Sequence, residues 1–198
     1  MTLPPIYVLR HGETIWNVER RLQGRRDSAL TERGHAQAEA QGRLLQALLK
    51  DIPTPDVYCS PLGRTRQTAQ IALQGIDLEV KYDARLQEVS AGEWEGRTRP
   101  DLFEELGMED GPSTEFTLFT NAPGGESVAE LQARCTSFLN YLTGPTVVIT
   151  HGVTGLMLRA LALCLDDSDM RQLERGQGCI YRLQDGSEIC LKENEVRI

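Results

Sequence analysis

Two histidines in this chain stand at the same kind of position. Residues 6–9 form an apolar run that leads into Arg10 and His11, and residues 146–150 form a second run that leads into His151. Each run is typical of a buried strand that ends in polar side chains. If the two strands lie parallel in one sheet, both imidazoles project into the crevice at its carboxyl edge, where open α/β sheets bind ligands. We therefore predict one site that contains both histidines.

The charges beside these histidines favour a phosphoryl group as the ligand. Arg10 directly precedes the first histidine, and Arg64 lies in the first turns of a predicted helix that follows another strand. Guanidinium groups present forked donors that match phosphate oxygens. In the loose transition state of phosphoryl transfer, negative charge gathers on the equatorial oxygens. We predict that Arg10, Arg64 and His151 bind these oxygens.

The same residue types suggest a two-step reaction. A neutral His11 could attack the phosphorus atom and form a phosphohistidine, which splits the transfer into two easier steps. Nearby arginines favour this role, because positive charge lowers the pKa of an imidazole and keeps it neutral. Glu88 follows a third strand and could protonate the leaving oxygen, then accept a proton from the attacking water.

Other residues of the same types compete for these roles. Glu13, Glu93 and Glu95 are rival carboxylates that periodicity does not exclude. His35 lies in a helical pattern and is expected to be structural, and Arg66 is expected to cover a helix face.

A metal site is the rival from a different class of chemistry. Two histidines and one carboxylate, His11, His151 and Glu88, could form a facial metal triad. Arg10 and Arg64 would repel a dication at such short range. We therefore expect neither a metal nor a cofactor.

Strands alternate with helices along the chain, which predicts an α/β fold with a mainly parallel sheet covered on both faces. An antiparallel hairpin is expected near one edge, around the turn at residues 185–186. A further helix is predicted after the capping box at residues 127–130 and is expected to end at residues 144–145. The predicted strands are 6–9, 56–60, 78–82, 146–150, 179–183 and 188–192, and the other predicted helices are 31–50, 64–73 and 156–165.

Two segments lack a clear period. Residues 16–28 are polar and are predicted to form a loop over the site. Residues 97–125 mix prolines with Phe103 and Phe119, and we interpret them as a small inserted cap whose phenylalanines serve in packing. Residues 1–198 then form a single domain.

Composition limits the class of protein. The chain has 198 residues, of which 40% are hydrophobic and 25% charged, as in ordinary soluble globular proteins. A net charge of −8 argues against a nucleic-acid or anionic-membrane surface. Apolar runs too short to span a bilayer and an N-terminus without signal-peptide features make a cytoplasmic location the expectation. Five scattered cysteines predict reduced thiols, and a homodimer is left open.

Taken together, these motifs resemble the histidine phosphatase superfamily, which includes the cofactor-dependent phosphoglycerate mutases. Residues 9–14, Leu-Arg-His-Gly-Glu-Thr, resemble its signature, and residues 60–65 resemble its second arginine motif. Several motifs in the expected order make the resemblance specific. The remaining matches are residues 16–17, 21–24, 27, 30–34, 68–69, 86–88, 92–96, 123–127 and 150–152.

The resemblance implies a three-layer α/β/α sandwich, no metal, and a role for each site residue. It assigns His11 as the phosphorylated nucleophile and Glu88 as the acid and base. It also selects Arg64 over Arg66. The residues that it implies for phosphate or substrate binding are Arg10, Asn17, Gln23, Gly24, Arg64, His151 and Gly152, while Gly12 is expected to let the backbone turn close to the anion.

A phosphatase is favoured over a mutase within this resemblance. Mutases of the family carry a Phe-Thr-Gly-Trp stretch where this chain has residues 21–24, Arg-Leu-Gln-Gly, and they carry a longer cap. The leading hypothesis is a phosphomonoesterase that acts on a small phosphorylated metabolite. A phosphoglycerate mutase and a non-catalytic phospho-ligand binding module are the alternatives. Candidate substrates include sugar phosphates, phosphoglycerates, nucleotide-related phosphates and the ribazole phosphate of cobalamin assembly.

Overall fold

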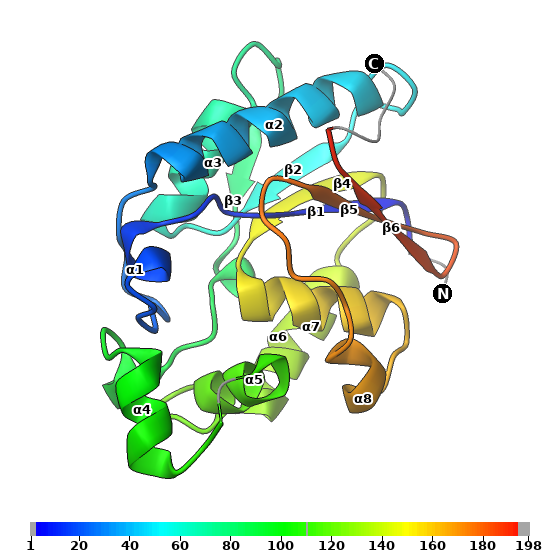
Figure 1. Ribbon diagram of the computed structural model, residues 1–198. Coiled ribbons are helices and arrows are strands. Elements are labelled where there is room, and N and C mark those ends of the chain that lie inside the picture. The colour runs from blue at the N-terminus through cyan, green and yellow to red at the C-terminus, as the bar shows by residue number, and fades with distance from the viewer. Residues whose placement is uncertain (1–2, 110, 194–198) are drawn as a thin grey trace.

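A computed structural model describes residues 3–109 and 111–193 of the chain. In these ranges a six-stranded sheet has the order β3-β2-β4-β1-β5-β6 (Figure 1). β2, β3, β4 and β1 run parallel, and β5 and β6 form an antiparallel hairpin at one edge, as predicted. The strands are β1 (Ile6–Arg10), β2 (Asp56–Cys59), β3 (Val80–Tyr82), β4 (Thr146–Thr150), β5 (Ile180–Gln184) and β6 (Ser187–Leu191).

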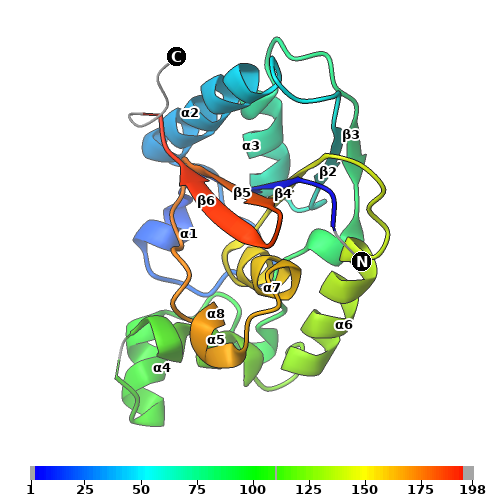
Figure 2. The ribbon, with the colours of Figure 1, turned by 90° about the vertical axis from the view of Figure 1, so that its right-hand side faces the viewer.

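Helices cover both faces of the sheet. α2 and α3 lie on one face and α6 and α7 on the other, with α4 and α5 further out on the second side (Figures 1 and 2). The predicted three-layer α/β/α sandwich is therefore confirmed. The helices are α1 (Ile15–Val18), α2 (Glu32–Leu48), α3 (Gly63–Ala72), α4 (Arg99–Leu106), α5 (Pro112–Thr120), α6 (Val128–Leu139), α7 (Gly152–Ala162) and α8 (Asp167–Met170).

Side chains that alternate between the two faces of the buried strands divide the hydrophobic core into two clusters. Tyr7 and Leu9 of β1 pack in one cluster with Leu44 of α2, whereas Ile6 and Val8 pack in the other cluster with residues of α6 and α7. Successive side chains of a strand point to opposite faces, so one buried strand supplies both layers. Each fully buried large apolar side chain contributes about 1.5–3 kcal/mol, which anchors the strand ends that carry the polar residues.

Helix α7 begins earlier than predicted. The periodic apolar pattern starts at Leu156, but the helix starts at Gly152, and His151 is its N-cap residue. Apolar periodicity detects the stripe that packs on the sheet and misses a first turn with few large side chains. The amino end of α7, with its exposed N–H groups, consequently lies at the carboxyl edge of the sheet, beside His151.

Other boundaries also differ from the sequence-based expectations. α6 ends at Leu139 rather than at the Gly-Pro pair, because its last carbonyls are already satisfied by Asn140 and the turn that follows it. α3, predicted at residues 64–73, begins at Gly63 and ends at Ala72. The segment expected as a loop contains the short helix α1, whose capping box joins Thr14 and Asn17.

The cap region is more regular than its sequence pattern suggests. Thr98 caps α4 through the N–H of Asp101, and Gly107 ends this helix at a left-handed φ of 62°. Leu102 and Phe116 are buried in the same cluster as the sheet residues of that side. Two short helices thus fold against the main layer, each too short to produce a clear period.

Gly12 is required where the chain passes close to the start of α2. A Cβ at this position would lie 2.2 Å from the carbonyl oxygen of Gly34, at the start of α2. Glycine is therefore needed here for the close approach of these two backbone segments, and its expected role in letting the backbone turn close to an anion stays a prediction.

Two composition-based expectations can be compared with the structure. All five cysteines are free thiols, as their odd number suggested. Among the residues that the structure describes, no helix is both long enough and apolar enough to cross a membrane.

Candidate active site

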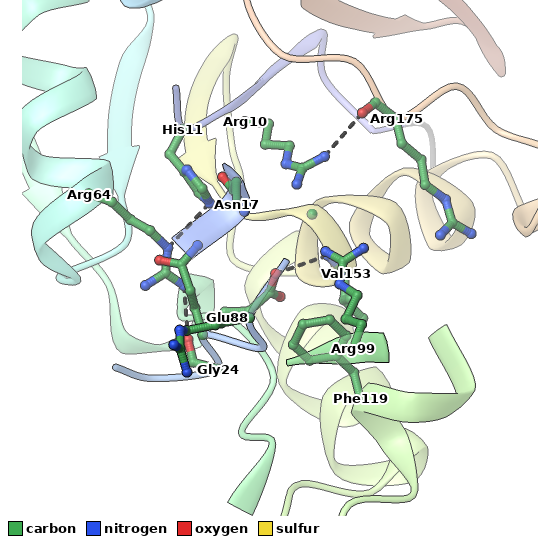
Figure 3. Close-up of a pocket in the computed structure, with 13 residues that line it drawn as sticks. Arg10, His11, Asn17, Gly24, Arg64, Glu88, Arg99, Phe119, Val153 and Arg175 are labelled. Atoms are coloured by element: carbon green, nitrogen blue, oxygen red, sulfur yellow. Dashed lines mark hydrogen bonds between the residues drawn. The ribbon is translucent and has the colours of Figure 1, made fainter. Parts of the chain in front are cut away.

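The two His-containing strand ends lie side by side. β1 and β4 are parallel neighbours, with Arg10 opposite Thr150, and the rings of His11 and His151 meet edge to face at 5.3 Å between centroids. A pocket opens at this edge of the sheet (Figure 3). Its lining residues are Arg10, His11, Asn17, Arg21, Gln23, Gly24, Arg64, Glu88, Arg99, Phe119, Gly152, Val153 and Arg175. His151 lies beside it, in an adjoining small cavity that Arg10 and Gly152 also line.

The hydrogen bonds of His11 define its tautomer. Nδ1 lies 2.8 Å from the carbonyl oxygen of Gly12, and Nε2 lies 3.2 Å from Nε of Arg64. A carbonyl oxygen only accepts and a guanidinium only donates, so the ring proton is on Nδ1 and the lone pair is on Nε2. The lone pair that a nucleophile needs therefore lies on the side of Arg64 (Figure 3).

Burial keeps both imidazoles neutral. Desolvation lowers the pKa of His11 well below its usual 6.5, and the positive charges of Arg64 and Arg10 lower it further. Burial and then Arg64 likewise lower the pKa of His151. A protonated imidazole has no lone pair for attack, so these surroundings preserve the nucleophilic form of His11 in mildly acidic solution.

We expect the rings of His11 and His151 to remain neutral at pH 6.5, where an unperturbed imidazole is about half protonated. Their pKa values are lowered, so protonation begins only as the pH falls well below this value. Ring ¹⁵N shifts measured across a pH titration would check this. Arg64→Met should raise the pKa of His11 because one repelling cation is lost, and a midpoint for His11 at or above 6.5 in the native chain would contradict the prediction.

Arg64 is held by the loop that precedes α2. Its NH2 donates to the carbonyl oxygen of Gly24 at 2.8 Å, and its NH1 donates to that of Arg26 at 2.7 Å. The side chain is only 1% exposed. A buried guanidinium with so many acceptors has one orientation, which aims its Nε at His11.

Asp27 links this loop to α3. Its carboxylate forms an ion pair of 2.9 Å with NH1 of Arg64 and accepts from the backbone N–H groups of Gly63 and Arg64 at 2.7 and 3.3 Å. The N-cap residue of α3, Leu62, makes no side-chain cap. Asp27 therefore supplies the missing cap from a distant segment and orients Arg64 at the same time.

Asp27→Ala is expected to lower the free energy of unfolding by about 1 kcal/mol, the usual effect of losing a helix cap. It should also weaken the binding of inorganic phosphate, because Arg64 loses an orienting partner. Denaturant titration and calorimetry would measure the two effects. Asp77→Ala, at an exposed position, is the matched control. Unchanged stability and phosphate affinity in Asp27→Ala would contradict the assignment.

Nε of Arg10 and Nδ1 of His151 are buried polar atoms at this edge with no hydrogen-bond partner among the described residues. Buried polar groups are nearly always hydrogen-bonded, and a guanidinium only donates, so the orphaned Nε of Arg10 indicates a ligand that accepts. A Cβ on Gly152 would lie 3.3–3.4 Å from the guanidinium of Arg10, which shows how closely the start of α7 fits this side chain.

Glu88 is buried against the amino end of α7. Its Oε1 accepts from the N–H groups of Val89 and Thr154, and its Oε2 accepts from the N–H of Val153 at 3.1 Å. Three backbone donors thus fix the carboxylate, and Oε2, with one of them, keeps a free lone pair (Figure 3). The hydroxyl of Thr154 lies 2.7 Å from the carbonyl oxygen of Gln87, its nearer acceptor, and 3.1 Å from Oε1 of Glu88.

The remaining predicted residues divide into those at the site and those away from it. Asn17, Gln23 and Gly24 line the pocket. Among the rivals, Glu95 accepts from backbone N–H groups of Arg25 and Ala91, and Glu13 bonds Thr31. The others, Glu93, His35 and Arg66, are exposed and do not line the pocket.

Several lining residues were missed by the sequence analysis. Arg99 and Phe119 come from the cap, and Phe119, expected to serve only in packing, lines the pocket as well. Arg21 is tied to the cap through the isolated bridge between itself and Thr98. Irregular segments give no period that would bring them to the sheet edge, although the Thr98 capping signal was readable.

A profile of the histidine phosphatase superfamily (branch 1) matches residues 6–190. The chain belongs to this superfamily. The resemblance inferred from the motifs is thereby confirmed.

Relatives within the superfamily carry names from both of its activities. The chain is 35% identical over 183 residues to a protein of Erwinia tasmaniensis named "Probable phosphoglycerate mutase GpmB", a match that covers 90% of this chain and 83% of the relative. Among solved structures it is similar to the alpha-ribazole phosphatase from Shigella flexneri, with 25% identity, a TM-score of 0.78 and 98% coverage of both chains. The Bacillus stearothermophilus YhfR structure matches with 26% identity, a TM-score of 0.76 and 98% coverage of both chains.

Proposed function

We propose that this histidine phosphatase superfamily member is a metal-independent phosphomonoesterase, which hydrolyses a small phosphorylated metabolite through a phosphohistidine on His11. The observation that carries the proposal is the placement of the His11 Nε2 lone pair, beside Arg64 in a pocket that Arg10 and Glu88 also line. Nucleophile, anion-binding donors and a proton carrier are thus within one pocket.

In the first step, Nε2 of His11 attacks the phosphorus atom and the bond to the leaving oxygen breaks. Glu88 donates a proton to this oxygen, so an alcohol departs. Nε of Arg10, and Nδ1 of His151 when it carries the ring proton, would donate to the equatorial oxygens. Nε of Arg64, now bonded to His11, would then donate to a phosphoryl oxygen.

In the second step, Glu88 takes a proton from water, and the resulting nucleophile attacks the phosphohistidine. The N–P bond breaks, inorganic phosphate leaves and His11 regains its neutral form. The bond from Nδ1 to Gly12 holds the ring in place throughout, because it uses the nitrogen that does not react.

Trapping the intermediate tests this proposal. The enzyme is mixed with substrates labelled in the phosphoryl group and quenched, and an acid-labile, alkali-stable label on the peptide that contains His11 is expected. A panel with sugar phosphates, nucleotide-related phosphates, 3-phosphoglycerate and ribazole phosphate would identify the substrate class. Binding across the panel with neither label nor turnover would overturn the proposal in favour of a non-catalytic binding module.

A phosphoglycerate mutase is the second candidate, because the curated relatives carry that name. It would use the same first step and return the phosphoryl group to a second hydroxyl rather than to water. The conversion of 3-phosphoglycerate to 2-phosphoglycerate in the presence of 2,3-bisphosphoglycerate distinguishes the two. Isomerisation faster than phosphate release would replace hydrolysis as the proposed reaction.

A further inference from the structure

Ser60 has no role in the two steps above, yet it lies against their machinery. It follows the last residue of β2, and its N–H donates to the carbonyl oxygen of Ile149 at 2.9 Å, which places it beside the end of β4. Its side chain is fully buried. The Ser60 Oγ lies 2.7 Å from Nε2 of His151, a short hydrogen bond between two buried groups.

Hydrogen-bond accounting gives this contact a direction. A neutral imidazole has one N–H, and burial with nearby cations lowers the pKa of His151, so the ring is neutral. If Nε2 carried the proton, Ser60 would accept it while also accepting from the N–H of Leu62 at 3.4 Å. The hydroxyl proton would then lack an acceptor among the described residues, and the lone pair on Nδ1 would be buried without a donor.

The opposite arrangement leaves fewer groups unsatisfied. When the hydroxyl of Ser60 donates to Nε2, the hydroxyl proton has an acceptor and the Nε2 lone pair has a donor. The proton of the neutral ring is then on Nδ1. Within the Ser60–His151 pair, the one group that then has no partner among the described residues is the Nδ1–H of His151. An orphaned donor is what a phosphoryl oxygen would satisfy, whereas an orphaned lone pair would repel it.

We propose that Ser60 is a positioning residue that sets the tautomer of His151, holding the proton on Nδ1 so that this nitrogen donates to the phosphoryl group. The phosphoryl ligand in this inference rests on the proposed function, but the tautomer does not. Ser60 acts through His151 and touches no reacting atom. Neutral imidazole adopts either tautomer when nothing selects one, so without the hydroxyl part of the population would present a lone pair to the anion.

Ring ¹⁵N spectroscopy tests the tautomer directly. The chain has three histidines, so their ring signals can be assigned with His35→Gln and His151→Gln variants. In the native protein we expect His151 to show a protonated Nδ1 and an unprotonated Nε2 at neutral pH. In Ser60→Ala the His151 pattern should shift toward protonated Nε2, while His11, whose Nδ1 bonds Gly12, keeps its own pattern.

Phosphate binding tests the consequence. We expect Ser60→Ala to weaken the binding of inorganic phosphate, measured by calorimetry, by about ten-fold, because one charge-assisted hydrogen bond becomes unfavourable. Ser60→Thr keeps a hydroxyl and should restore most of the affinity. Thr146→Val is the matched control: it removes a buried hydroxyl from the far end of β4, where that hydroxyl donates to Gly144, and should leave binding unchanged.

The outcomes separate this inference from the proposed function. A native His151 with its proton on Nε2 would overturn the inference, and it can be measured even if Ser60→Ala fails to fold. A folded Ser60→Ala with native phosphate affinity would also overturn it. If native protein shows protonated Nδ1 and the ten-fold loss occurs, yet no substrate labels His11, the inference stands and the proposed phosphatase activity fails.

Discussion

His11→Ala is expected to abolish the phosphoenzyme and to lower kcat by at least about 10⁴-fold, as removal of a catalytic nucleophile does in other enzymes. The Nε2 lone pair lies on the side of Arg64, and no other described side chain of the pocket lining offers a comparable nitrogen. Without a phosphohistidine intermediate, water would have to attack the phosphate ester directly. The negative charge of this dianion would oppose the attack. Steady-state kinetics and rapid quenching of labelled substrate measure the two effects.

A test of folding and a matched histidine variant are the controls for His11→Ala. His11→Ala removes a buried ring, so circular dichroism and thermal unfolding must show a folded variant. His35→Ala removes an exposed imidazole from α2 and is expected to keep native kcat and labelling. Full turnover by His11→Ala, or label that remains on the protein, would exclude phosphohistidine chemistry at this residue.

Glu88→Gln is expected to lower kcat on alkyl phosphates by about 10²–10⁴-fold, the usual contribution of general acid–base catalysis. The amide has nearly the shape of the carboxylate, and its oxygen can retain the two bonds that Oε1 accepts from the N–H groups of Val89 and Thr154, while the bond from Val153 is lost. It cannot exchange a proton with the leaving oxygen or the attacking water. The variant should therefore bind inorganic phosphate while both chemical steps slow down.

An activated leaving group should separate the two roles of Glu88. The phenolate of p-nitrophenyl phosphate departs without a proton, so the first step in Glu88→Gln should recover while hydrolysis of the phosphohistidine stays slow. A burst of p-nitrophenol and accumulated label on His11 are expected. Glu93→Gln, at an exposed rival carboxylate, is the control and should behave as native. Native kcat in Glu88→Gln on alkyl phosphates would assign the acid–base role elsewhere.

Local patterns were sufficient to predict the sheet and the central residues. The buried strands β1 and β4 end in polar side chains at their carboxyl ends, and two parallel strands bring such ends to one edge. His11 and His151 therefore meet for a reason that is visible in the chain. The capping box of α6 was also readable, because it depends on residues three positions apart.

Contacts between irregular segments were not predictable in the same way. Asp27 caps α3 from a loop 36 positions earlier in the chain, and Arg64 bonds carbonyl oxygens of that loop. Such contacts depend on backbone direction and not on side-chain period. The start of α7 was not predicted because its first turn has few large apolar side chains and so adds nothing to the helical period. The N–H groups of this turn that bind Glu88 were missed as a result.

By itself the sequence determined an α/β sheet with His11, His151 and Arg10 at one edge, because strand period and strand ends are local properties of the chain. Only the tertiary structure decided which nitrogen of His11 carries the lone pair, how Glu88 is anchored and which hydroxyl faces His151. These features depend on donors and acceptors that lie far apart in sequence. Each of them is defined by hydrogen bonds, which form only over a narrow range of distances and angles. Folding brings the donors and acceptors within that range.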